Sequence, residues 1–276
     1  MGFDPAWLAL REPADHAARD PGLMAQAAAL VVEGEAVIVD LGCGTGSNLR
    51  ALAGALPARQ SWRLVDHDPA LLAAARAALS AWADTASTGD DGALELVRGR
   101  QSLTVRFLQT DLTADLAPVL EGAQLVTAAA LFDLCSPAWI GGFAAALAVR
   151  RLPLYTALTY DGVEHWSPAH PADAAVLAAF LSHQRRDKGF GPSAGPAATQ
   201  ALADAFASHG YAVTRAPSAW QLGPAQSGLV ASLAAGIASA AAEAGLDPAT
   251  TTAWAAARQT ASAAIGHEDF LALPQA

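Results

Sequence analysis

Short apolar runs that alternate with helical segments restrict the folds open to this chain more than any other feature of its sequence. The run Ala36–Asp40 is β-branched and apolar up to its final acid, which predicts a strand buried on both faces. A glycine-rich turn, an Ala/Leu-rich helical segment and a second strand, Trp62–Asp66, follow in that order. This part of the chain therefore predicts a βαβ unit, in which the two strands run parallel.

The alternation continues to about residue 160. Further strands are predicted at Leu94–Val97, Thr104–Gln109, Gln124–Phe132 and Leu154–Tyr160, and helices at Asp68–Trp82, Leu112–Leu120 and Pro137–Arg150. The polar, glycine-containing segment Asp84–Gly92 is predicted to be a surface loop. Strands and helices that take turns in this way are typical of a doubly wound α/β fold, with helices on both faces of a parallel sheet.

The two ends of the chain add helices and late strands. Towards the N-terminus a helical segment is predicted around Leu23–Val32. After Tyr160 the prediction is a helix at Ala172–Arg186, a helix at Pro196–His209, a strand at Tyr211–Leu222, two helices at Gln226–Ala244 and Pro248–Ile265, and a final strand at His267–Leu273. Gly210 is placed to end the second of these helices.

The charge of the chain limits its partners. Sixteen Lys and Arg stand against 26 Asp and Glu, a formal net charge of −10, and Lys188 is the sole lysine. Binding to a nucleic-acid backbone rests on clustered cations, and an anionic bilayer repels an acidic protein. We therefore expect no nucleic-acid and no membrane partner, and a small molecule as the substrate.

Other segments of the sequence predict the cellular location of the protein and the redox state of its cysteines. The first residues contain no basic region followed by an apolar one, as a secretory signal would. The most apolar stretch, Gly228–Gly245, consists mainly of small residues and carries Glu243, so it is too weakly hydrophobic to predict a spanning helix. Two cysteines, Cys43 and Cys135, do not form a disulfide framework. We expect a soluble, cytoplasmic protein with two free thiols.

The turn after the first strand carries the chemistry. Glycine lets a ligand approach the backbone closely, and the following helix offers free N–H groups at its N-terminus. Here Gly42, Gly44 and Gly46 alternate with other residues, and Asp40 precedes them. The dinucleotide fingerprint requires its third glycine where this chain has Ser47, so the spacing disfavours NAD.

The segment VIVDLGCGTGSNLRAL resembles motif I of class I S-adenosylmethionine (SAM) dependent methyltransferases. Asp66 ends the second strand and Asp111 follows a later one, as acids do in that family. The resemblance implies a Rossmann-like enzyme of the small-molecule type with SAM as cofactor. The fold it implies is a doubly wound, seven-stranded, mostly parallel sheet with an antiparallel last strand, preceded by a helical N-terminal segment and interrupted by a two-helix insertion before the last strand.

The same resemblance implies a domain plan. The chain is predicted to be a single methyltransferase domain over 1–276, with an N-terminal helical lid at 1–34 and a core at 35–223 and 266–274. An acceptor-side cap is expected at 161–196 and the helical insertion at 224–265.

The family pattern also implies which residues hold the methionine part of SAM. Asp40 orients the glycine loop and faces the methionine end, while Gly42 and Gly44 let the backbone approach the ligand. Ala130, after the fourth strand of the family fold, lines the same part of the cofactor. Arg19 is a candidate for binding the methionine carboxylate from the lid, or alternatively a solvated helix arginine.

Other residues are implied for the adenosine part. Asp66 accepts the two ribose hydroxyls, with His67 beside it. Asp111 reads the adenine amino group and the Leu112 N–H a ring nitrogen, although Asp111 could instead only cap the helix that follows. Cys43 lies close to the ligand as a small filler of a tight turn rather than as a nucleophile, because no cation is its sequence neighbour.

Acceptor-side residues are predicted from their place after the later strands. His183 is the candidate general base, with Tyr160, Asp161 and His165 as rivals. Asp133, Trp166 and Arg186 are candidate substrate contacts, and an anionic acceptor is expected if Arg185, Arg186 and Lys188 face the pocket. The alternatives are a solvated helix end for 183–188 and a core position for Trp166. The histidines lack the spacing of ligand pairs, so no metal site is predicted.

The leading functional prediction is a methyltransferase that acts on a small molecule with an O, N, S or C nucleophile. One alternative is a non-catalytic SAM-binding or assembly protein in which the helices at 226–265 form a homodimer. A weaker alternative is an NAD-dependent oxidoreductase.

Overall fold

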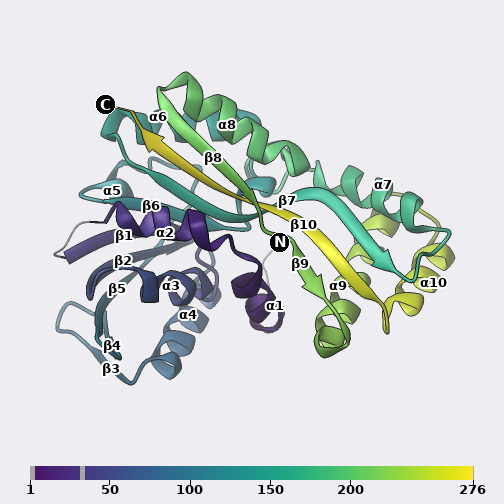
Figure 1. Cartoon of the computed structure of the whole chain (residues 1–276), viewed down its shortest axis with the longest axis horizontal. Coiled ribbons are helices and arrows are strands. Elements are labelled where there is room, and N and C mark those ends of the chain that lie inside the picture. Colours follow the sequence, from purple (N-terminus) through teal and green to yellow (C-terminus); the bar gives the residue numbers. More distant parts are fainter. Residues whose placement is uncertain (1–3, 32–34, 276) are drawn as a thin grey trace.

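The computed structural model describes residues 4–31 and 35–275. One mixed β-sheet of ten strands crosses the molecule (Figure 1), and its strands are β1 Glu35–Leu41, β2 Arg59–Asp66, β3 Thr85–Thr88, β4 Leu94–Arg98, β5 Gln101–Gln109, β6 Leu125–Ala129, β7 Leu154–Ser167, β8 Tyr211–Pro217, β9 Trp220–Leu222 and β10 Ser262–Pro274. The strand order is β3-β4-β5-β2-β1-β6-β7-β10-β8, and β9 pairs with β10. The five strands from β5 to β7 are parallel, and β10 is antiparallel to β7, β8 and β9.

Helices cover both faces of this sheet. They are α1 Pro5–Ala18, α2 Pro21–Ala29, α3 Ser47–Leu52, α4 Pro69–Trp82, α5 Ala117–Leu120, α6 Pro137–Arg150, α7 Asp173–Gln184, α8 Ala198–Ser208, α9 Ser227–Glu243 and α10 Pro248–Arg258. Ile38 of β1 packs into one core together with α2, α3 and α4, whereas Val39 and Leu41 pack into a second core with α6 and α8. Adjacent strand residues point to opposite faces, so consecutive apolar residues such as Ile38 and Val39 of β1 supply both cores. The predicted doubly wound α/β fold is confirmed.

The sheet contains three strands, β3, β4 and β9, in addition to the seven that the family pattern predicts. The segment predicted as a polar loop contains β3, which forms a hairpin with β4 at one edge of the sheet. The strand predicted at 211–222 is split into β8 and β9. The split falls at Ser218, whose N–H donates to the His267 carbonyl at 2.8 Å, so both pieces remain attached to β10.

Several predicted boundaries are wrong by a few residues. The helix predicted at 248–265 ends at Arg258, and β10 begins at Ser262 rather than His267. The segment 261–266 consists of small residues apart from Ile265 and matches a helical composition, but residues 262–265 pair with β7 instead. The helix predicted at 112–120 is limited to α5, and the strand predicted at 124–132 ends at Ala129. Val32, the last residue of the helix predicted at 23–32, lies outside the described residues, as do residues 1–3, 33, 34 and 276.

The antiparallel pair β7–β10 continues past the edge of the helical layers and carries α7, α9 and α10 (right side of Figure 1). These helices enclose a small apolar core of their own around Trp254. Arg258 is buried between Trp254 and Trp166, where it pairs with Asp173. The two predicted inserted helices thus build, together with α7, a subsidiary layer on the extended strands.

One helical stretch of the described chain, Pro224–Glu243, is long and apolar enough to cross a membrane by length and composition alone. It consists of a short 3₁₀ turn and α9. In the structure α9 packs against α7 and α10 and contributes Ala234, Ile237 and Ala241 to their shared core.

The first helix, α1, is tied across the fold by polar contacts. Glu12 forms two hydrogen bonds with Arg50 of α3, and His16 contacts Ser47 at 3.0 Å. Between these two residues, Asp15 accepts a hydrogen bond of 3.0 Å from the Trp220 indole of β9. α1 therefore joins the start of α3 to the antiparallel edge of the sheet.

Candidate functional site

The loop between β1 and α3 has the conformation that its glycines allow. Gly42, Gly44 and Gly46 all have positive φ angles, of 62°, 52° and 76°, which other residues seldom adopt. A Cβ at Gly42 would lie 3.1 Å from the side chain of Leu131, and one at Gly44 would lie 3.1 Å from that of Leu8. The loop thus lies at the carboxyl end of β1, between the turn after β6 and helix α1.

Asp66 ends β2 beside this loop and is buried. Its Oδ2 accepts the Gly44 N–H at 3.0 Å, and its Oδ1 accepts the Asp68 N–H at 3.0 Å. A carboxylate has about four acceptor positions, so two remain for a further pair of donors. The carboxylate is therefore held rigidly by the loop while retaining the capacity to accept a diol.

Asp40 is fully buried under the loop. Its Oδ1 accepts a hydrogen bond of 2.7 Å from the Asn48 amide, which also donates to Thr127 at 3.0 Å. Its Oδ2 has no partner among the described residues. Burial raises the pKa of Asp40 to about 7, while Asn48 and the charge of Arg19 act in the opposite direction. An ionised, unpaired oxygen at this place is a site for a cationic group.

Arg19 follows α1 and reaches the same interior region. It is 6% exposed, and its Nε and Nη1 have no hydrogen-bond partner within residues 4–31 and 35–275. Burial raises the pKa of both Asp40 and Tyr155, and the charge of Arg19 partly opposes each rise, so Arg19 lies near both. A buried guanidinium with free donors is a site for a carboxylate, because Arg binds carboxylates through two parallel hydrogen bonds. Between them, Arg19 and Asp40 offer opposite charges at one end of the loop.

The predicted adenosine contacts lie next to Asp66. His67 is exposed, with its Nδ1 3.4 Å from Asp66 Oδ1. Asp111 is also exposed, and its Oδ1 accepts the N–H and the hydroxyl of Thr113 at 2.8 Å, which lowers its pKa. Leu112 is buried, and its carbonyl accepts the Trp139 indole N–H at 3.0 Å. Asp111 thus closes a local turn with Thr113 shortly after β5, and its role as an adenine contact stays a prediction.

Cys43 in the glycine loop and Ala130 after β6 are two further predicted cofactor contacts. Cys43 is buried, and burial followed by the charges of Asp40 and Asp66 raises the pKa of its thiol. The thiol is therefore un-ionised and suited to filling the turn. Ala130, after β6, has a φ of 51°, an uncommon value for a residue with a side chain. Such strain is often found at ligand sites, and here it lies beside the glycine loop through Leu131.

A second cluster of polar groups lies at the start of the β7–β10 extension. The Tyr160 hydroxyl donates to Glu164 at 2.8 Å, and the same carboxylate accepts the Trp166 indole N–H at 2.9 Å. The ring centroid of Tyr160 is 6.0 Å from that of His267, and the ring of Trp220 is 5.0 Å from His267. The predicted acceptor residue Tyr160 therefore belongs to an aromatic cluster on the two long strands.

Asp133 lies in the short turn after β6 and is 8% exposed. Its Oδ1 has no partner in the part of the chain that the structure describes. Burial raises the pKa of Asp133 to about 6, and the charge of Arg11 from α1 partly opposes this shift. The Asp133 charge in turn raises the pKa of Tyr160, after burial and Glu164, so these two groups are also neighbours.

The structure places the other predicted acceptor residues in different surroundings. His183 of α7 contacts Glu243 of α9 at 3.1 Å, and Arg186 donates to the Glu243 carbonyl at 2.6 Å. The Trp166 ring packs edge-to-face against the Trp254 ring in the subsidiary core, with ring centroids 5.3 Å apart. The contacts observed for these three residues join the end of α7 to α9, and the end of β7 to α10. Their catalytic or substrate roles remain predictions.

Asp161 and His165 lie on β7 beyond Tyr160. Asp161 accepts the Val163 N–H at 2.8 Å, and burial raises its pKa. A Cβ at Gly266 of β10 would collide with the Asp161 carboxylate, which explains the glycine there. His165 is exposed. Their proposed role as rival bases is likewise untested by these contacts.

Sequence reasoning missed Arg11, Asp15, Trp220 and His267. Arg11 forms a two-point salt bridge with Asp15, the closest atoms being 2.9 Å apart, and its guanidinium lies 4.8 Å from the Trp220 ring centroid. An Arg–Asp pair spaced by four residues in a helix is a recognisable signal, but it is usually a surface pair. Nothing in the sequence around Arg11 and Asp15 indicates that they contact Trp220, which lies 205 positions after Asp15.

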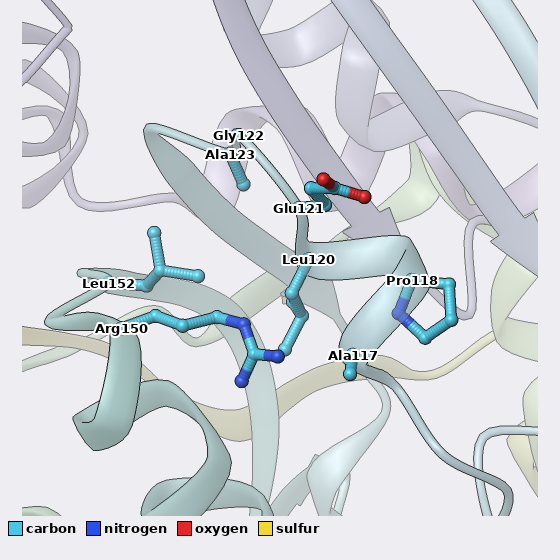
Figure 2. A pocket seen from close by; sticks show the side chains of 8 residues that line it. All are labelled: Ala117, Pro118, Leu120, Glu121, Gly122, Ala123, Arg150 and Leu152. Atoms are coloured by element: carbon cyan, nitrogen blue, oxygen red, sulfur yellow. The ribbon is translucent and has the colours of Figure 1, made fainter.

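Two cavities of about 660 and 570 Å³ lie away from the glycine loop. Figure 2 shows the first, which is lined by α5, the turn before β6 and the end of α6, with the Arg150 side chain across it. Because β6 and β7 start beside it, this cavity is at the amino ends of the parallel strands, opposite the edge where such sheets bind ligands. Among residues 4–31 and 35–275, no group of three or more His, Cys, Asp or Glu side chains could hold a metal.

Comparisons with known proteins address the fold. No protein-family model and no curated protein sequence matches this chain. Among solved structures, a cyclopropane-fatty-acyl-phospholipid synthase-like protein from Lactobacillus casei is similar, with 16% identity, 98% of this chain and 94% of that chain covered, and a TM-score of 0.55. The YcgJ protein from Bacillus subtilis has 14% identity, covers 92% and 97%, and has a TM-score of 0.52.

A SAM-dependent methyltransferase from Geobacter sulfurreducens, solved with S-adenosylhomocysteine, has 15% identity, full coverage of both chains and a TM-score of 0.47. At these identities the likeness concerns the fold. The strand order, the parallel strands from β5 to β7 and the antiparallel β10 agree with it. The strand order of this chain and its likeness to the first two of these structures show a Rossmann-like α/β fold.

Proposed function

We propose that this protein binds SAM and transfers its methyl group to a small-molecule acceptor. The observation that carries the proposal is the pair of buried, opposite charges at the glycine loop. Arg19 has two free donors and Asp40 a free carboxylate oxygen within the described structure. The methionine part of SAM carries a carboxylate and an ammonium group, which complement these two residues.

The residues around the loop fit the remainder of the cofactor. Asp66 retains two acceptor positions for the ribose hydroxyls. Asp111 and Leu112 follow β5, which neighbours β2, at the place of the adenine contacts in the family pattern. NAD fits less well, because its pyrophosphate would bring two negative charges close to the buried Asp40 carboxylate.

The chemistry required of the protein is chiefly positioning. Bound SAM supplies a methyl group on a good leaving group. Asp40, Arg19 and Asp66 would fix the two ends of the cofactor, so that the methyl group has one orientation relative to the acceptor. The formal charge of −10 argues against a nucleic-acid acceptor, and we propose a soluble small molecule of the cytoplasm instead.

Thermal unfolding in the presence of candidate ligands tests the proposal. A ligand that binds only the folded state raises the midpoint in proportion to its affinity and concentration. We expect SAM and S-adenosylhomocysteine to raise the midpoint and NAD to leave it unchanged. A rise with NAD alone, or no rise with either SAM-type ligand, would contradict the proposed function.

The affinity for S-adenosylhomocysteine should depend on pH through Asp40. The raised pKa of about 7 means that the carboxylate is increasingly protonated as the pH falls below 7. The ligand ammonium favours the ionised form, so binding releases a proton there, and affinity should fall by up to about tenfold for each pH unit below 7. Arg19, Asp66 and the Cys43 thiol are the ionisable groups coupled to Asp40.

Calorimetric titrations between pH 5 and pH 8 measure this dependence. Asp40→Asn keeps the acceptor oxygen for Asn48 and removes the titrating group. Its affinity should be weaker at pH 8 and almost constant with pH. An equally steep pH dependence in Asp40→Asn would assign the proton to another group.

A further inference from the structure

We propose that Asp133 is the general base of the methyl transfer, and that the acceptor is an uncharged small molecule whose O–H or N–H group lies between Asp133 and His267. The inference rests on the proposed function. It differs from the sequence prediction, which placed the base at His183 or on β7.

The position of Asp133 is the first observation. It lies three residues after Ala130, in the turn whose Leu131 side chain meets the glycine loop at Gly42. The carboxyl ends of β1 and β6 are neighbours in the sheet, so this turn borders the place proposed for the methionine part of SAM. A group at this point can face both the cofactor and an acceptor.

The second observation concerns two of the buried polar atoms that lack a partner, one on Asp133 and one on His267. Asp133 Oδ1 and His267 Nδ1 belong to side chains that are 8% and 5% exposed, and neither atom has a partner among the described residues. Buried polar atoms are satisfied in the great majority of cases, so such exceptions indicate an external ligand. A carboxylate oxygen accepts a hydrogen bond, and a neutral imidazole nitrogen accepts or donates one.

The charge of Arg11 acts on both Asp133 and His267. Its charge opposes the rise in the pKa of Asp133, and it acts together with burial to lower the pKa of His267 to about 3. Arg11 therefore lies near both groups, on the face of α1 that also presents Leu8 to Gly44. The contacts agree with this: Arg11 lies 4.8 Å from the Trp220 ring centroid, and that ring lies 5.0 Å from His267. The turn that carries Asp133 contacts β7, the strand on which Tyr160 pairs with His267 of β10. Asp133 and His267 are thus placed at one region beneath α1.

The charges of this region select the class of acceptor. Arg11 is neutralised by Asp15, and His267 is uncharged at neutral pH. Asp133 then adds a negative charge, with Glu164 nearby through Tyr160. An anionic acceptor would be repelled, whereas a neutral O–H or N–H group can donate to Asp133. The rings of Tyr160 and Trp220 beside His267 favour an acceptor with an aromatic group.

The proposed step transfers the methyl group from the SAM sulfur to the acceptor. The acceptor oxygen or nitrogen forms a bond to the methyl carbon, the carbon–sulfur bond breaks, and its electron pair remains on sulfur. The acceptor proton passes to Asp133 Oδ1 and later leaves to solvent. A pKa of Asp133 near 6 suits this role, because the group is ionised at neutral pH yet more basic than an ordinary carboxylate.

The test uses the full chain, methyl-tritiated SAM and three probes of one shape: phenol, aniline and benzoate. We expect methylation of phenol and aniline above the enzyme-free rate and none of benzoate. Asp133→Asn should reduce the rate constant by about 100-fold, the lower range for loss of a general base, without weakening S-adenosylhomocysteine binding. Asp204→Asn, which removes an exposed carboxylate on α8, should retain the wild-type rate.

A pH profile distinguishes a base from a merely structural residue. The wild-type rate at saturating SAM should rise through about pH 6, as Asp133 ionises, and the rise should be absent in Asp133→Asn. The titratable groups beside Asp133 are Tyr160, Cys135 and His267, and the charge of Arg11 acts on it as well. Burial raises the pKa of Tyr160 and of Cys135 and lowers that of His267 to about 3, so none of these three titrates near pH 6. Asp133→Asn should also unfold at the same temperature as wild type or higher, because it removes an unpaired buried charge.

The outcomes separate this inference from the proposed function. If S-adenosylhomocysteine does not bind to wild type, the proposed function fails. If it binds, but only benzoate or no probe is methylated, the inferred acceptor class is wrong. If Asp133→Asn keeps the wild-type rate and pH profile, Asp133 is not the base.

Discussion

Replacing Asp66 with alanine is expected to weaken binding of S-adenosylhomocysteine by on the order of 100- to 10,000-fold. The carboxylate is buried and already fixed by the N–H groups of Gly44 and Asp68, so it would meet the ribose hydroxyls without further ordering. Each hydrogen bond to a charged group contributes roughly 1.5–3 kcal/mol, and two would be lost. The dissociation constant, measured by calorimetry at pH 8, gives the effect directly.

Asp66→Ala also removes the acceptor of the Gly44 N–H, so the loop itself could change. Asp66→Asn keeps one acceptor oxygen and the shape of the side chain, and it should give a smaller loss. Asp90→Ala, an exposed acid in the β3–β4 loop, is the matched control and should bind as wild type does. An unchanged dissociation constant in folded Asp66→Ala would exclude Asp66 as the ribose contact.

The second large effect is expected at Arg19. Arg19→Met keeps much of the volume of the side chain and removes the buried charge. Truncation of a buried charged hydrogen-bonding partner costs about 2–5 kcal/mol, so the affinity for S-adenosylhomocysteine should fall by roughly 30- to 4,000-fold. In the absence of ligand the variant should be at least as stable as wild type, because Nε and Nη1 have no partner among the residues that the structure describes.

A second ligand separates the carboxylate contact from a general disturbance of the site. 5′-Methylthioadenosine contains the adenosine part and lacks the amino-acid part. Arg19→Met should bind it as wild type does, whereas Asp66→Ala should bind it weakly. Equal losses of both ligands in Arg19→Met would show that Arg19 supports the fold of the site and does not hold the carboxylate.

The strands and turns around the cofactor were predictable because their signals are local. An apolar run, a glycine-rich turn and a helix follow one another within about twenty residues, and Asp66 ends the next apolar run. Since parallel strands place their carboxyl ends at one edge, Asp40, Asp66 and Asp111 were expected together. The errors fell on small residues such as those at 261–266, whose composition fits a helix or a strand equally well.

The acceptor side depended on contacts between distant segments. Asp15 meets Trp220 over 205 residues, and His267 faces Arg11 only because β10 pairs with β7 while α1 crosses the strand ends. The same tertiary arrangement gives His183 a partner in Glu243 and Trp166 a place against Trp254.

The sequence by itself thus determined the order of the strands along the chain, the glycine turn and the acids of the cofactor side, because period and turn chemistry act over a few residues. The tertiary structure alone decided which buried ionisable side chains keep a polar atom without a partner among the described residues, with Arg19, Asp40 and Asp133 as examples. That outcome depends on the burial of each group and on the neighbours that packing brings to it, neither of which is encoded in spacing.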